Sequence, residues 1–250
     1  MSDAEDQHVA PPPRFSEIVS EAADLYSARF AALVPTFVLA YVVLVSLPLL
    51  AFIDLSDAAL ATLAFALQVL SALVGSTLFA SASIVYSDYV AGDRSSLRAA
   101  LVSIRSLTRE VITAALFSAI FSMFALTLLA SLGLLLQPLF VGPPILIQVV
   151  AIERLRLREA WPRTRAIASG QWTRVVGMLL GVVLAIALVL IGIFGFVEAG
   201  TRAASDAARL GVFVTVQGLV AGLTYSFLAA AQFVLYRDLT QRGAETPSEK

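Results

Sequence analysis

The amino-acid sequence predicts an all-α fold: a polytopic helical membrane protein with about six transmembrane helices, arranged as three repeats of an interfacial helix plus a hairpin. Composition is the first observation, since 59% of the 250 residues are apolar, 14% are charged and the mean hydropathy is +0.87. A soluble domain is about half apolar and a quarter charged. Long charge-free stretches and arginines gathered in alternate loops are the other two observations. The net charge of −1 gives no preference for nucleic acid.

The chain opens with segment 1–13, which is acidic and proline-rich and which we expect to be a disordered cytoplasmic tail. The segment lacks the basic start of a signal peptide. A membrane domain is expected over 14–240. It begins with an interfacial helix at about 15–29, whose apolar residues recur at the spacing of one helical face. They are Phe15, Ile18, Val19, Ala22, Leu25 and Tyr26.

The crossings are predicted from stretches that contain no Asp, Glu, Lys or Arg. A helix needs roughly 20 apolar residues to cross the ~30 Å hydrocarbon core. One stretch, 111–152, would be about 63 Å long as a single helix, so it must turn back, near its cluster of Gly133, Pro138 and Pro144. The predicted crossings are about 31–53, 58–87, 111–132, 135–152, 175–197 and 210–236.

The basic residues set the expected orientation. Fifteen of the 17 lie in four segments, namely 1–30, 88–110, 153–174 and 237–250. Short loops rich in arginine stay in the cytoplasm. We therefore expect a multi-pass protein of a bacterial cytoplasmic membrane, with the N terminus and a C-terminal tail at 241–250 both in the cytoplasm.

Two of the arginine-rich segments resemble each other at a fixed offset of 60 residues. Residues 93–105 read DRSSLRAALVSIR and residues 153–165 read ERLRLREAWPRTR. Each leads into a hairpin, as the segment at 15–29 does, so each is expected to form an interfacial helix, at about 95–109 and 157–170. Spacings of four and eleven place the arginines of each copy on one helical face. These are Arg94, Arg98 and Arg105, and Arg154, Arg158 and Arg165.

The six arginines are the candidate site. Arginines on interfacial helices bind the phosphates of anionic lipids or a cytoplasmic protein partner. The alternative is that they only fix the topology and extend their aliphatic stems along the bilayer. No other binding site, metal site or cofactor site is expected, and the oligomeric state is left open.

Residue usage argues against an enzyme. The chain has no cysteine, its one histidine is His8 and its one lysine is Lys250. Thiol, Schiff-base and zinc chemistries therefore lack their usual residues. The acids at the ends of the crossings are Asp88, Glu153, Glu198 and Asp238. We expect them to cap helices or to pair with a neighbouring arginine such as Arg154 or Arg237.

Two functions remain. The first is a non-enzymatic accessory or scaffold protein that acts through the arginines. The second is a small transporter or channel for an uncharged solute. Its path would be lined by Gln68, Gln148, Gln217 and Gln232 and by Gly75, Ser76, Thr77, Ser81 and Ser83. Amides within crossings more often bond across helices. No ionisable residue lies in the middle of a crossing, as ion-coupled transport usually requires. The first function is therefore favoured.

Four short motifs carry a resemblance to a known family. They are the entry helix 15–30, the Gly142-Pro143-Pro144 turn before a crossing that ends at Glu153, the helix 160–170, and the terminal Tyr236-x-Asp238-Leu239-x-x-Arg242. In these the chain resembles poorly characterised bacterial integral-membrane families, including the membrane domain fused to some glycerophosphoryl diester phosphodiesterases. The resemblance implies the membrane fold alone, because the chain has no catalytic barrel and lacks a phosphodiesterase set of histidines and acids.

Overall fold

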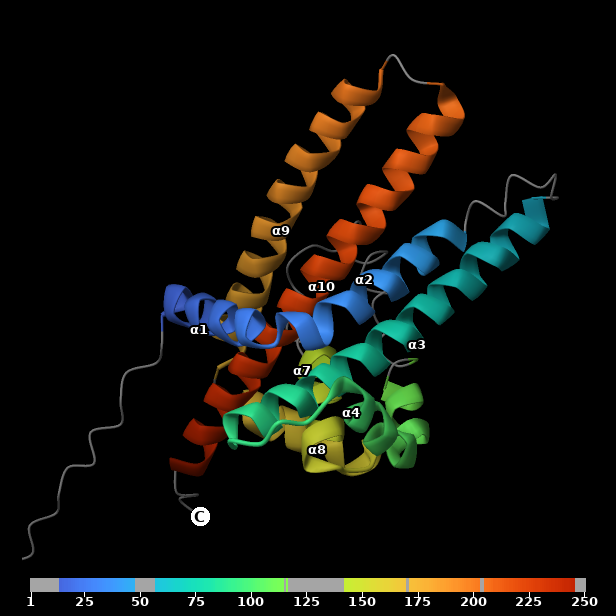
Figure 1. Ribbon diagram of the computed structural model, residues 1–250. Helices are drawn as coiled ribbons and strands as arrows, with labels where there is room; N and C mark the ends of the chain where they lie inside the picture. Colours follow the sequence, from blue (N-terminus) through green and yellow to red (C-terminus); the bar gives the residue numbers. More distant parts are fainter. Residues whose placement is uncertain are drawn as a thin grey trace, which may run out of the picture.

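The computed structural model describes residues 14–47, 57–114, 116, 142–169, 171–202 and 205–245 (Figure 1). Within these ranges all regular structure is helical, which confirms the all-α fold. The helices are α1 (Phe15–Ala28), α2 (Phe30–Ser46), α3 (Asp57–Val90), α4 (Leu97–Ile104), the 3₁₀ turn η2 (Arg105–Leu107), α7 (Gly142–Glu153), α8 (Leu157–Ala168), α9 (Trp172–Thr201) and α10 (Asp206–Glu245).

Some predicted segments fall outside this description. The tail 1–13, the proposed turn before residue 142 and most of the crossing at 111–132 are among them; the helix that follows η2 is described over 108–114. The predicted tail at 241–250 is helical up to Glu245, where α10 ends.

Two helices in the described part of the chain are long and apolar enough to cross a membrane. They contain the segments Val69–Val90 of α3 and Ala208–Arg242 of α10. A third span is present if α1 and α2, which meet at 89°, form one broken span. These lengths and compositions are those of membrane-spanning helices, so the coarse prediction of a membrane protein is supported.

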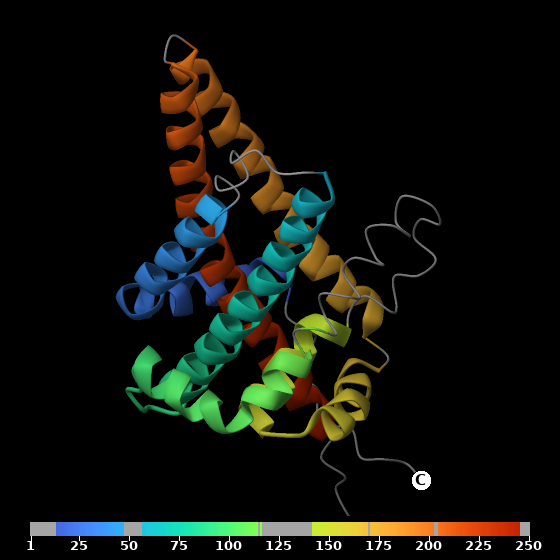
Figure 2. The ribbon, with the colours of Figure 1, turned by 90° about the vertical axis from the view of Figure 1, so that its right-hand side faces the viewer.

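The α10 helix is the centre of the molecule. It packs against α1, α2, α3, α7, α8 and α9, and Figures 1 and 2 show it running from beside the end of α9 through the middle of the bundle. Its 40 residues span about 60 Å at ~1.5 Å per residue, roughly twice the hydrocarbon core. The α10 helix is therefore much longer than a single crossing requires.

The α7 helix is enclosed on all sides. Every residue from Ile145 to Ala151 is buried, as expected of a helix that is apolar around its whole circumference. It lies between α3, α8 and α10. This position brings its last residue, Glu153, to the place where α8 and α10 meet.

A sharp corner separates α1 from α2 at Arg29. The Arg29 Nη2 donates to the backbone oxygen of Asp93 at 3.3 Å, and its Cζ lies 4.7 Å from the ring centroid of Tyr89. On the other side, Ile18, Ala22 and Leu25 bury the apolar face of α1. The guanidinium thus ties the corner to the end of α3.

Candidate functional site

The α4 helix is amphipathic and presents arginines outward. Its N-cap is Ser96, whose Oγ accepts a hydrogen bond from the Ala99 N–H at 3.2 Å. Leu97, Ala100 and Ile104 recur at helical spacing and are buried in the core. This fixes the rotation of the helix and leaves the side chains of Arg98 and Arg105 exposed.

The α8 helix repeats this arrangement. Ala160, Thr164, Ile167 and Ala168 are buried, whereas Arg158 and Arg165 are exposed. Both views place α4 and α8 at the end of the molecule opposite the end where α9 finishes and α10 begins (Figures 1 and 2). The two arginine-bearing helices therefore share one end of the fold.

The first arginine of each copy is not on a helix, so the prediction that three arginines share one helical face is wrong. Arg94 lies in the non-helical residues before the cap of α4. Arg154 lies between α7 and α8 with a φ of 53°, the left-handed conformation that lets the chain turn sharply. Its Nη2 donates to Ser103 Oγ of α4 at 3.1 Å, so Arg154 connects the two copies instead of extending the α8 face.

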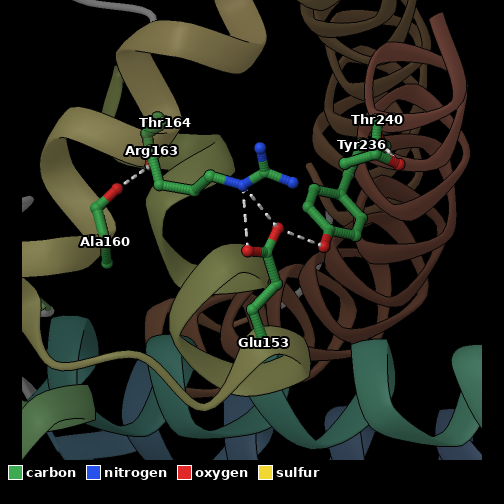
Figure 3. A network of polar contacts seen from close by, with 6 residues as sticks. All are labelled: Glu153, Ala160, Arg163, Thr164, Tyr236 and Thr240. Carbon is green, nitrogen blue, oxygen red and sulfur yellow. Dashed lines mark hydrogen bonds and ion pairs between the residues drawn. The ribbon is translucent and has the colours of Figure 1, made fainter. Parts of the chain in front are cut away.

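Other arginines at this end are neutralised by acids. Arg163 Nε lies 3.0 Å from Glu153 Oε2, and the Tyr236 hydroxyl donates to Glu153 Oε1 at 2.9 Å. Figure 3 shows Glu153 reached from α8 on one side and from α10 on the other. This one carboxylate therefore joins α7, α8 and α10.

Two further pairs stabilise the same end of α10. Arg237 pairs with Glu21 of α1, and Arg242 Nε lies 2.9 Å from Asp238 Oδ1. The expectation that the acids at helix ends pair with arginines holds for Glu153 and Asp238. The suggested partners are wrong, because Glu153 binds Arg163 instead of Arg154, and Arg237 binds Glu21 instead of an acid beside it.

The remaining arginines of the candidate site are unpaired. Within the described ranges Arg94, Arg98, Arg105 and Arg158 make no side-chain hydrogen bond or ion pair. Arg165 places its Cζ 5.1 Å from the ring centroid of Trp161, a cation–π contact that their four-residue spacing could have predicted. The contacts of Arg163 and Tyr236 with Glu153 could not be predicted in this way, because the partners are 10 and 83 residues apart in the sequence.

The polar groups suggested for a solute path are mostly satisfied inside the protein. Gln148 Nε2 donates to Gln232 Oε1 at 3.0 Å, joining α7 to α10. On α3, the hydroxyls of Thr77, Ser81 and Ser83 donate to carbonyl oxygens four residues earlier. Their acceptors are Leu73, Thr77 and Phe79. The Gln68 side chain is outside the described part of the structure.

The Tyr236 hydroxyl offers a test of the network around Glu153. We expect Tyr236→Phe to lower the free energy of unfolding by about 1.5 kcal/mol, because it removes a hydrogen bond to a charged acceptor. Tyr86→Phe is the matched control. The Tyr86 hydroxyl is buried without a hydrogen-bond partner among the described residues, so its removal should change stability little. Thermal unfolding in detergent measures both; equal losses in the two variants would contradict the assignment.

No cluster of three or more acids or histidines that could hold a metal ion occurs among the described residues. Comparisons with protein-family models, with curated proteins and with solved structures find no match to this chain.

Proposed function

We propose that the chain is a non-enzymatic accessory or scaffold protein of a bacterial cytoplasmic membrane, which binds anionic lipid headgroups through the arginines of α4 and α8. Six crossings form three repeats of interfacial helix plus hairpin, and both termini lie in the cytoplasm. The observation that carries the proposal is the sorting of charges. Arg163, Arg237 and Arg242 are paired with acids, whereas Arg98, Arg105 and Arg158 at the same end are not.

The chemistry of the unpaired arginines fits a lipid phosphate. A guanidinium offers several N–H donors in a planar fork that matches phosphate oxygens. Each arginine near an anionic leaflet contributes about 1 kcal/mol of binding. The α4 helix with the η2 turn after it, and the α8 helix, each have a buried apolar face and exposed arginines, features of helices that lie in a membrane interface. A cytoplasmic protein with an acidic surface is the alternative ligand.

The family resemblance bears only on the membrane fold in this proposal. The families that the motifs resemble include a membrane domain that accompanies a separate phosphodiesterase domain. The proposal takes from them the membrane fold and no activity, substrate or cofactor.

A pathway for an uncharged solute has less support. Its suggested lining on α3 consists of hydroxyls that bond to their own helix, and two of its glutamines bond to each other. Groups engaged in this way support helix packing.

Replacement of the six arginines tests the proposal. We expect the variant with Arg94, Arg98, Arg105, Arg154, Arg158 and Arg165 changed to Gln to co-purify with much less anionic lipid than the parent. The difference should be larger at low salt, because salt screens exposed charges. Mass spectrometry of lipid extracted from the purified protein measures it.

The control is Arg202→Gln with Arg209→Gln, which removes charge at the other end of α9 and α10 and should leave lipid retention unchanged. A thermal unfolding curve for each protein shows whether it is still folded. Equal anionic-lipid retention in the parent and a folded sextuple variant would overturn the proposal and leave the arginines a topological role.

A further inference from the structure

A groove lies beside α4, where α4 and the helical residues 108–114 approach α3. It encloses about 320 Å³, which is within the range of small-ligand sites. Arg98 and Arg105 contribute to one part of its lining. Leu101, Val102, Val111 and Ile112 contribute an apolar part.

The basic part of the lining is suited to an anion, and the apolar part is suited to a hydrocarbon chain. Within the described ranges neither guanidinium has an acid partner. Arg98 and Arg105 are seven residues apart, so they project from the same side of the chain about 10 Å apart along the helix axis, and their long side chains can converge on one anion. Several of the apolar residues are exposed, Val102 to 65% and Ile112 to 39%.

We infer that this groove binds one anionic phospholipid molecule, with its phosphate on Arg98 and Arg105 and an acyl chain along Leu101, Val102, Val111 and Ile112. The inference rests on the proposed function and makes it more specific: binding occurs at one discrete site with an apolar requirement, not only by diffuse attraction to a basic surface. Charge complementarity selects the anion, and the apolar wall selects a lipid over free phosphate.

The experiment compares two ways of disabling the groove. Arg98→Gln with Arg105→Gln removes its charges. Ile112→Trp, with Val102→Trp as an independent second variant, fills its apolar part while every arginine remains. Arg202→Gln with Arg209→Gln, at the other end of α9 and α10, is the charge-matched control, because neither residue lines the groove. Thermal unfolding shows which variants are folded, and the exposure of Val102 makes that position tolerant of a larger side chain.

The measurement is native mass spectrometry of each purified chain titrated with phosphatidylglycerol, with phosphatidylcholine of the same chain length and with inorganic phosphate as separate probes. We expect one phosphatidylglycerol to bind tightly to the parent and to the charge-matched control. Affinity should fall roughly 30-fold in the double-glutamine variant, and comparably in a tryptophan variant. Phosphatidylcholine and inorganic phosphate should bind weakly to all of the proteins.

Each alternative result has a distinct meaning. Loss in the Arg98 and Arg105 variant with no loss in folded tryptophan variants would overturn the groove site while leaving the general lipid-binding proposal intact. Displacement of the bound lipid by inorganic phosphate at an equal concentration would overturn the apolar requirement. Phosphatidylglycerol binding that no variant changes would overturn both proposals.

Discussion

Gly218→Leu is expected to lower the free energy of unfolding by about 3 kcal/mol, the upper end for overpacking in a well-packed interior. Gly218 and Gly222 lie one turn apart on α10, and the backbone of α2 passes directly over them. A Cβ atom added at Gly218 would lie 2.6 Å from the Cα of Val42, and one at Gly222 would collide with the backbone of Val38. Because the obstacle is backbone, no rotamer change relieves it, and α2 must move away from α10.

A matched control is a glycine on α9 that has open space around it. Gly177 on α9 has no atom within 4 Å of an added Cβ, so Gly177→Leu should leave the unfolding midpoint nearly unchanged. Thermal unfolding in detergent compares the two variants. A Gly218→Leu protein that keeps the parental midpoint would contradict the close packing of α10 against α2.

Gln148→Leu is expected to lower the free energy of unfolding by about 1–3 kcal/mol, because it leaves the amide of Gln232 buried without its partner. Gln148 is fully buried and Gln232 is 8% exposed. Replacing both residues by leucine should recover most of the loss, since two apolar side chains of similar size leave no unsatisfied group.

A double-mutant cycle measures this coupling. Gln217→Leu on α10 is the control, because Gln217 is only partly buried and makes no side-chain hydrogen bond within the described part of the chain. Additive losses for Gln148→Leu and Gln232→Leu would contradict a direct amide bond. Uptake of a neutral solute into proteoliposomes that fails specifically on Gln217→Leu would favour the transporter.

The helices of the basic end show how far local sequence reasoning reaches. Helical spacing predicts that Leu97, Ala100 and Ile104 share the buried face of α4, and the structure buries all three. The same spacing placed Arg94 on that helix, which is wrong because Ser96 caps it two residues later. A helical wheel gives the face of a residue only where the helix exists, and the cap decides where it begins.

The sequence by itself determined that the chain is helical and suited to a membrane, and that its arginines gather in a few short segments between apolar stretches. These properties follow from apolar run length and from periodicity, which are local along the chain. Only the tertiary structure decided which charged and polar side chains pair with each other. Glu21 and Arg237 are 216 residues apart, Gln148 and Gln232 are 84 apart, and Glu153 meets Tyr236 across 83 residues. Such pairs depend on how α10 packs against α1, α7 and α8, and that packing is set by the summed burial of many apolar side chains, which no single motif encodes.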